Sequence, residues 1–215
     1  MSAWLPSRHA LILTIYRWEN ALAIRQQPAG AQLARALGAV GRLIEQIRLE
    51  QWSAPTPCTA WTVRDLVAHL VGMNLVFTAL LSGQGPPERG VDHLGDDPAA
   101  AYRHSATALQ AAFAQPGVLE RIYPGPLGEA SGAERLQIRI YDLLVHGWDL
   151  AQATGQPAAL PEDLTEQALI FVRAQLSTRP RTGRFAPAQP VADNAPAIDR
   201  LAAFLGRSVN AGFRR

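Results

Sequence analysis

Residues 132–155 constrain the fold most, because nearly every face of a helix built from them is apolar. Ser131 and Glu134 form an S-x-x-E capping box that starts this helix, and Gly155 ends it. A helix of this kind is about 24 residues long and spans roughly 36 Å. Since a helix that is apolar almost all round is buried, the segment predicts a helix inside a protein core.

Helical patterns also occur elsewhere in the chain, where apolar residues recur at three- and four-residue steps. Thr62 with Asp65 is close to a capping box, and Asp97 is followed by Pro98 at a first helical position. The sequence shows no alternation of strands and helices of the kind that builds a parallel sheet. The stretch 118–128 looks extended or irregular. The sequence therefore predicts an all-α protein, an antiparallel four-helix bundle with additional C-terminal helices. Besides 132–155, the expected helices cover residues 32–52, 62–81, 97–113, 161–177 and 195–205.

The composition is that of a folded soluble protein, with 48% hydrophobic and 18% charged residues among 215. A net charge of +2 does not indicate a nucleic-acid partner, and the single cysteine, Cys58, suits a reducing cytoplasm. No apolar run reaches the length of about 20 residues expected of a membrane span. We expect an N-terminal extension with a helical pattern over residues 1–28, one bundle domain over 29–207, and a flexible tail over 208–215.

Polar side chains interrupt the apolar helix along one stripe, in which Asp142, His146 and Asp149 follow Arg135 and Arg139. One interpretation is that this stripe is the solvated edge of the helix, with Arg139 and Asp149 as surface charges. The other interpretation is a buried polar site, because buried acids and imidazoles need partners or a metal ion.

A histidine on the predicted second helix, His69, bears on this choice. An isolated histidine beside an apolar face is most often a packed core residue. Together with Asp142 and His146, however, it offers two imidazoles and one carboxylate from facing helices, which is how bundle cores bind metals. Three protein ligands leave a coordination position open, as in catalytic sites, and this donor set suits Zn²⁺, Fe²⁺, Ni²⁺ or Mn²⁺.

Other histidines and the cysteine are weaker candidates. The chain has no glycine-rich phosphate loop, no G-x-S-x-G elbow and no H-E-x-x-H motif. His9, His93 and His104 are expected to be solvated. Cys58 precedes the second helix, where it is either a reactive thiol or a small buried hydrophobe.

Three stretches, "WSAPTPCTAWTVRDLVAHLVG", "LLVHGWDLAQATG" and "FAPAQPVADNAPAIDRLAAFLGR", resemble the mycothiol-dependent maleylpyruvate isomerase group of the DinB-like superfamily. The likeness covers about residues 31–207. It implies a DinB-like bundle that binds a divalent ion, commonly zinc, through His69, Asp142 and His146. Asp142 stands where the isomerase itself often has glutamate. The isomerase also carries a larger C-terminal α/β domain, for which the tail of this chain is too short.

The resemblance implies a thiol-dependent transferase or isomerase, in which the ion binds mycothiol or a similar low-molecular-weight thiol that attacks a small electrophile. Trp61, Asn74 and Trp148 would line the thiol or substrate pocket, and Asp149, or Arg139 through a water, would orient a ligating imidazole. The expected partners are the thiol and a small-molecule substrate, without nucleic acid or membrane, and the likeness alone implies a homodimer. The alternatives are a metal-stabilised binding or regulatory module, a metal-dependent hydrolase, and an Fe²⁺ oxygenase.

Overall fold

The computed structural model describes residues 28–58, 60–88, 90–125, 128–177, 181 and 185–209. The expectation for residues 1–28 lies outside these ranges except for Pro28, and of the expected tail only Ser208 and Val209 lie within them. The described elements are α2 (Ala29–Glu45), a 3₁₀ turn (Leu49–Gln51), α3 (Val63–Leu81), α4 (Pro98–Phe113), β1 (Ile122–Tyr123), β2 (Ala130–Ser131), α5 (Gly132–Thr154), α6 (Glu162–Ser177) and α7 (Ala197–Phe204).

The helix starts and stops follow the signals in the sequence. The Thr62 side chain accepts from the Asp65 amide and the Asp65 carboxylate bonds back, so the capping box of α3 is complete. Ser131 and Glu134 make the same pair of bonds at α5. Gly155 ends α5 in the left-handed conformation at φ 68°, which glycine adopts without a steric penalty.

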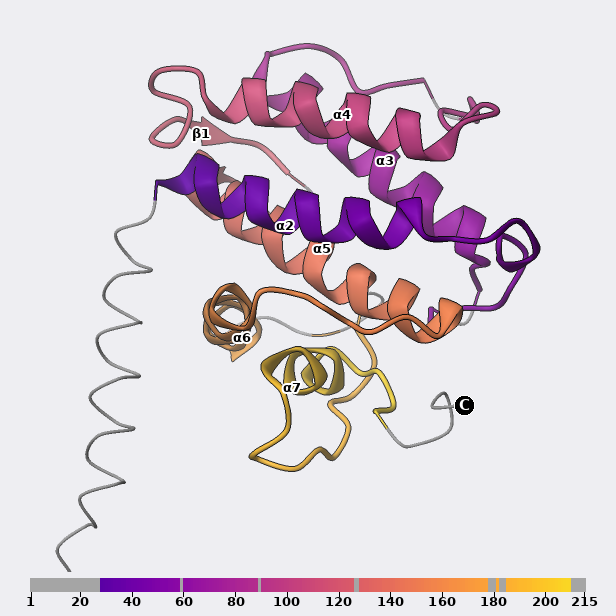
Figure 1. The fold of residues 1–215 in the computed structure, drawn as a ribbon. Helices are drawn as coiled ribbons and strands as arrows, with labels where there is room; N and C mark the ends of the chain where they lie inside the picture. Colours follow the sequence, from indigo (N-terminus) through magenta and orange to yellow (C-terminus); the bar gives the residue numbers. More distant parts are fainter. Residues whose placement is uncertain are drawn as a thin grey trace, which may run out of the picture.

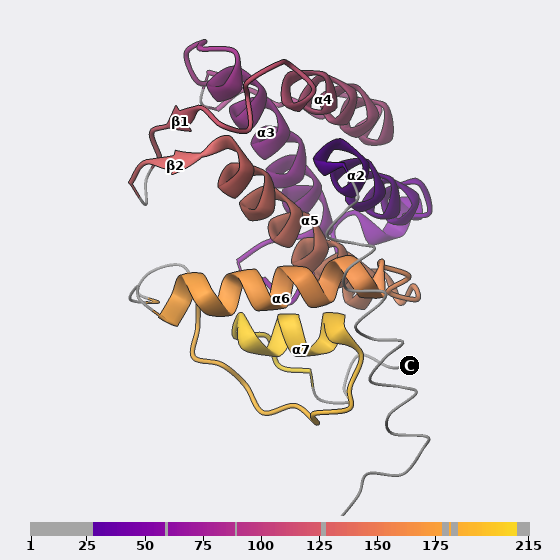
Figure 2. The same ribbon diagram turned by 90° about the vertical axis from the view of Figure 1, so that its left-hand side faces the viewer.

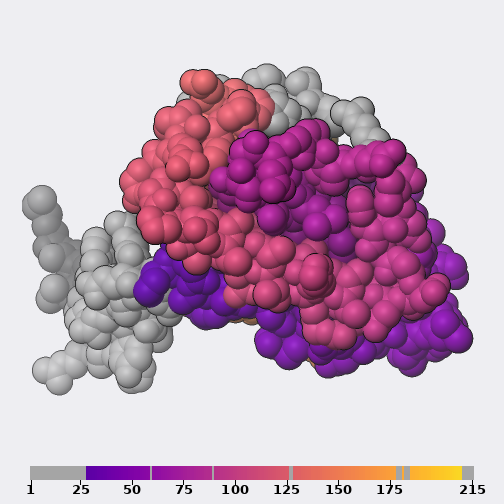
Figure 3. All heavy atoms as spheres, turned by 90° about the horizontal axis from the view of Figure 1, so that it is seen from above, coloured from indigo at the N-terminus to yellow at the C-terminus, as the bar shows by residue number. Residues whose placement is uncertain are grey.

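Helices α2, α3, α4 and α5 form the predicted bundle (Figure 1). Helix α5 packs against α2 and α3, while α4 packs against α3 and α2, which closes a four-membered ring. Helices α6 and α7 lie side by side across the bundle, next to α5 (Figure 2). Seen from above, α4 and the segment after it cover much of the upper face (Figure 3). The all-α prediction with additional C-terminal helices is confirmed, and α5 is the buried centre of the fold.

One local prediction needs correction. The first helix ends at Glu45 and not near Trp52, because a 3₁₀ turn follows in which Gln51 caps the Arg48 amide and donates to the Thr154 carbonyl. Ile47 and Trp52 still pack on the core from this turn, so the apolar pattern outlasts the helix. The expectation that residues 118–128 are extended or irregular is confirmed, because they contain β1, which pairs with β2 in antiparallel register, Ile122 opposite Ser131.

Helix α3 also corrects the expectation that no segment is long and apolar enough to span a membrane. Val63–Leu81 meets that limit by length and composition, with a mean hydropathy of 1.4 over its most apolar window. Its apolar residues have partners within the described fold, because α3 packs on both α4 and α5. The packing of a core helix accounts for its composition.

Gly132, the first residue of α5, is a position where the fold requires glycine. A Cβ atom there would lie 1.9 Å from the Val118 carbonyl oxygen. Gly132→Ala should therefore lower the free energy of unfolding by at least about 2 kcal/mol, measured by urea denaturation. Gly38→Ala on α2 is the control, since its Cβ would meet only the tip of Arg42 at 3.8 Å. That variant should gain up to about 1 kcal/mol from helix propensity, and equal effects of the two substitutions would contradict this packing.

Candidate metal centre

Three side chains from two helices converge between α3 and α5. His69 Nε2 lies 3.6 Å from Asp142 Oδ1, and His146 Nε2 lies 3.5 Å from the same oxygen. One ligand atom from each residue lies within 4.8 Å of the others. Asp142 and His146 share a face of α5 because they are four residues apart, and α3 supplies His69 opposite them. The structure thus brings together the three residues that the sequence singled out.

His69 Nε2 has an unusual environment in this cluster. The atom is buried and makes no hydrogen bond to any described residue. Buried ring nitrogens normally have a partner, since leaving one without a partner costs about 1–3 kcal/mol. A divalent cation between the two imidazoles and the carboxylate would satisfy this nitrogen, so the donor set and its geometry fit such an ion.

Arg139 holds the Asp142 carboxylate of the cluster in position. Its guanidinium is fully buried and pairs through Nη1 with Asp142 Oδ2. Nε and Nη2 donate to Asn74 Oδ1 at 3.1 and 2.7 Å, and Nη2 also donates to the Leu70 carbonyl at 2.8 Å. Because Arg139 occupies Oδ2, the other oxygen of Asp142 is left to face the imidazoles.

Asp149 fixes the imidazole of His146. His146 Nδ1 lies 2.9 Å from Asp149 Oδ2, and a carboxylate can only accept, so Nδ1 carries a hydrogen. In the neutral imidazole, Nε2 is then the nitrogen whose lone pair faces the cluster. Arg207, which follows α7, donates to Asp149 Oδ2 at 2.9 Å. Arg139 and Asp149 are each 0% exposed, so the interpretation of the stripe as a solvated edge is wrong.

The charges around the cluster shift the pKa values of its members. Burial alone would raise the pKa of Asp142, but the imidazoles of His146 and His69 and the guanidinium of Arg139 hold it well below its ordinary value. Burial alone would lower the pKa of His146, yet the carboxylates of Asp142 and Asp149 raise it well above its ordinary value. In the metal-free cluster, the favoured state is therefore ionised Asp142 and Asp149 beside a protonated His146.

The three residues expected to line the thiol or substrate pocket lie in different parts of the structure. The ring centroid of Trp61 lies 4.7 Å from that of His69 and 5.9 Å from that of His146, so the indole packs beside both imidazoles. Asn74 is fully buried and supports Arg139, and its amide donates to Ser105 Oγ at 3.1 Å. Trp148 is buried on the side of α7, where its indole donates to Asp199 at 2.8 Å.

Cys58 lies on the Nδ1 side of His146, where it belongs to a second group of possible metal ligands. Its Sγ is 3.8 Å from His146 Nδ1 and 3.3 Å from Asp149 Oδ2, and Arg207 donates to it at 3.3 Å. Cys58, His146 and Asp149 could also hold a metal by distance, on the opposite edge of the same imidazole. Arg207 could not be predicted as part of this site, because nothing local marks a residue so far along the chain as a partner of α5.

Two other histidines lie elsewhere in the described fold. His104 is exposed on α4, as expected, whereas His93 is half-buried in the loop before α4. His9 lies outside the described residues.

The fold and the cluster define a four-helix-bundle protein in which two imidazoles and a carboxylate face one another across two helices. The chain belongs to the family of the mycothiol maleylpyruvate isomerase N-terminal domain, whose model matches residues 33–151. That range contains all three residues of the cluster and the four bundle helices apart from their outermost turns.

Relatives of this chain include a protein from two strains of Mycobacterium tuberculosis, described as uncharacterized. It is 38% identical over 178 residues, which cover 81% of this chain and 95% of that protein. The crystal structure of the mycothiol-dependent maleylpyruvate isomerase matches with a TM-score of 0.53 at 16% identity, over 67% of this chain and 69% of that one. A histidine-to-alanine mutant of that isomerase matches with the same TM-score. These two structures support the fold.

The raised pKa of His146 makes the metal-free protein less stable as the pH rises. Its folded pKa lies above the unfolded value of about 6.5, so its protonation stabilises the fold fully below that pH. This contribution is lost as the pH climbs through the folded pKa, at no more than about 1.4 kcal/mol per pH unit. Urea denaturation with a chelator between pH 6 and pH 9 measures the loss.

His146→Gln is the control for this measurement, because it keeps a polar side chain but removes the titrating group. Its free energy of unfolding should depend less on pH over the same range. Equal pH dependence in the two proteins would show that His146 does not carry the proposed charge.

Proposed function

We propose that His69, Asp142 and His146 bind one divalent ion, Zn²⁺, and that the protein is a thiol-dependent transferase or isomerase acting on a small electrophile. The observation that carries the proposal is the buried His69 Nε2, which has no hydrogen-bond partner and points to the same place as Asp142 Oδ1 and His146 Nε2. Two imidazoles and one carboxylate are a ligand set used by catalytic zinc, and by Ni²⁺, Fe²⁺ and Mn²⁺.

The ligand count supports a reactive site over a purely structural one. Three protein donors leave at least one coordination position for another molecule, whereas structural zinc sites are usually closed by four. When bound there, zinc lowers the pKa of a coordinated thiol and stabilises the thiolate, which is the nucleophilic form. The chain then needs no nucleophile of its own.

The surrounding residues position the ligands and limit the access of water. Asp149, held by Arg207, keeps the hydrogen of His146 on Nδ1 and leaves Nε2 free to ligate. Arg139 holds Asp142 by one oxygen, so that the other ligates alone. Trp61 covers both imidazoles with its ring, which shields the site on one side.

The family supports a low-molecular-weight thiol as the second participant, and mycothiol is the thiol named in the family's own description. A cytoplasmic location and a homodimer belong to the same proposal.

Metal binding is tested first, by zinc content and zinc affinity of the purified full chain. His69→Ala and His146→Ala should each weaken zinc binding by more than the roughly 100-fold that removal of an outer-shell partner costs. His104→Ala is the matched control, since this histidine is exposed on α4, and it should keep one equivalent. Full zinc content in both ligand variants would overturn the site assignment.

Thiol dependence is tested with the zinc-loaded protein and a panel of electrophiles, each with and without mycothiol. We expect consumption of at least one electrophile that requires both zinc and the thiol, and that falls at least 100-fold in His69→Ala. Zinc that raises stability without any thiol-dependent turnover would favour the binding or regulatory module. Iron with oxygen-dependent turnover would favour an oxygenase, and would likewise contradict the thiol proposal.

A further inference from the structure

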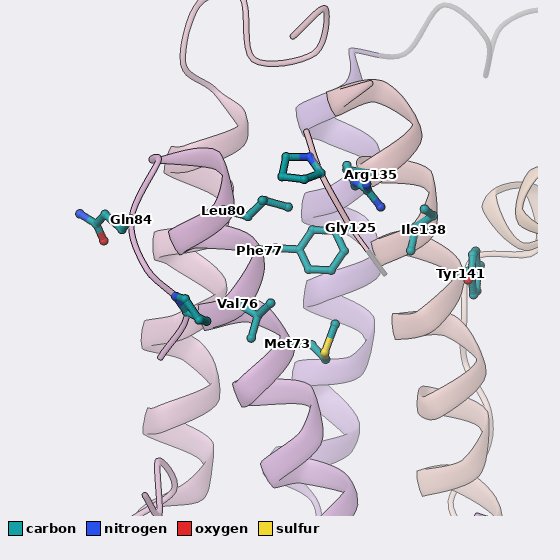
Figure 4. A pocket seen from close by; sticks show the side chains of 11 residues that line it. Met73, Val76, Phe77, Leu80, Gln84, Gly125, Arg135, Ile138 and Tyr141 are labelled. Atoms are coloured by element: carbon teal, nitrogen blue, oxygen red, sulfur yellow. The ribbon is translucent and has the colours of Figure 1, made fainter. Parts of the chain in front are cut away.

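A cavity of about 440 Å³ lies between α3, α5 and the segment around β1 (Figure 4). Its volume is in the range of small-molecule binding sites. Side chains of α3 line one side and those of α5 the other, and most of them are apolar. Those that matter here are Met73, Val76, Phe77, Leu80, Ile138 and Arg135.

The cavity and the metal cluster lie along the same pair of helices, α3 and α5. Met73 lies one helical turn after His69 on α3, and Ile138 lies one turn before Asp142 on α5. From His69 to Leu80 the helix rises about 16 Å. The cluster and the cavity therefore occupy successive turns along the same pair of helices, with the cluster at one end.

Few polar groups line the cavity. Arg135 is its one charged lining residue among the described ones, and its guanidinium already donates to the Tyr123 and Gly128 carbonyls at 2.9 and 2.7 Å. Gly125 leaves room for that guanidinium, since a Cβ there would lie 2.4 Å from Arg135 Nη2. A ligand body in this cavity would meet mainly carbon atoms, which bind apolar groups by excluding water.

We infer that the substrate of the proposed reaction has an extended apolar body that fills this cavity and an electrophilic end that reaches the metal cluster. The inference rests on the proposed function for the reacting end and on the cavity for the body. A short dicarboxylate would make no contacts with the cavity walls. An alkyl or aryl group would instead cover these apolar walls and exclude water from them. The apolar body, and not the reacting group, then sets the specificity.

Straight-chain carboxylates test this, because they are unreactive and differ only in length. Butanoate, hexanoate, octanoate and decanoate are titrated into the zinc-loaded full chain by calorimetry. The carboxylate is attracted to the cluster end, and each added methylene buried in the cavity should lower the Kd about two- to fourfold. A Kd that does not change with chain length would overturn the inference.

Two variants that fill the cavity localise the effect. Val76→Trp changes a residue at the exposed rim, and Leu80→Phe changes one deeper on α3. Both should weaken decanoate binding at least tenfold and leave butanoate binding unchanged. Ile170→Trp, on the exposed face of α6, is the matched control and should bind the whole series as the unmodified chain does. If Val76→Trp and Leu80→Phe keep the full chain-length dependence, the ligand lies elsewhere and the inference is wrong.

The same titrations separate this inference from the proposed function. Chain-length dependence in a protein that binds no zinc would contradict the proposed function and leave the apolar site standing. Stoichiometric zinc without chain-length dependence would contradict the apolar substrate and leave the metal site standing.

Discussion

The buried ion pair between Arg139 and Asp142 is the contact on which the rest of the site depends. A guanidinium with no exposed surface is costly unless its donors are paired. Here Asp142, Asn74 and the Leu70 carbonyl take four of its five N–H groups, so the cost is offset only when α3 and α5 pack in this register. The same pairing aims one oxygen of Asp142 at the two imidazoles. One interaction therefore specifies the helix packing and the geometry of the cluster.

A second ion pair, between the partly buried Arg207 and the buried Asp149, repeats this arrangement on the far side of His146. It ties the segment after α7 to the C-terminal part of α5, which gives the additional C-terminal helices a role in positioning a ligand. With both acids balanced by arginines, a divalent ion would leave the centre with a net positive charge. Such a centre attracts anions, including a thiolate, while the neighbouring cavity favours apolar groups.

The sequence predicts local features of this protein better than distant ones. Capping boxes at Thr62 and Ser131 depend on residues three apart, so both helix starts could be predicted. His69, Asp142 and His146 could be proposed together because their helices had to face each other in a bundle. Arg207 could not, since its partner Asp149 lies 58 residues away and no periodicity links them. The end of α2 was also misjudged, because Ile47 and Trp52 reach the core from a turn that continues the apolar pattern.

We propose that the ion binds on the Nε2 side of His146, with His69 and Asp142. X-ray absorption at the zinc edge of the loaded full chain tests it most directly, because Cys58 offers a competing site on the Nδ1 side of the same imidazole. We expect nitrogen and oxygen ligands at about 2.0–2.2 Å, two of them imidazoles, with no sulfur before any thiol is added. A sulfur ligand at about 2.3 Å in the thiol-free protein would place the ion with Cys58 and contradict the account.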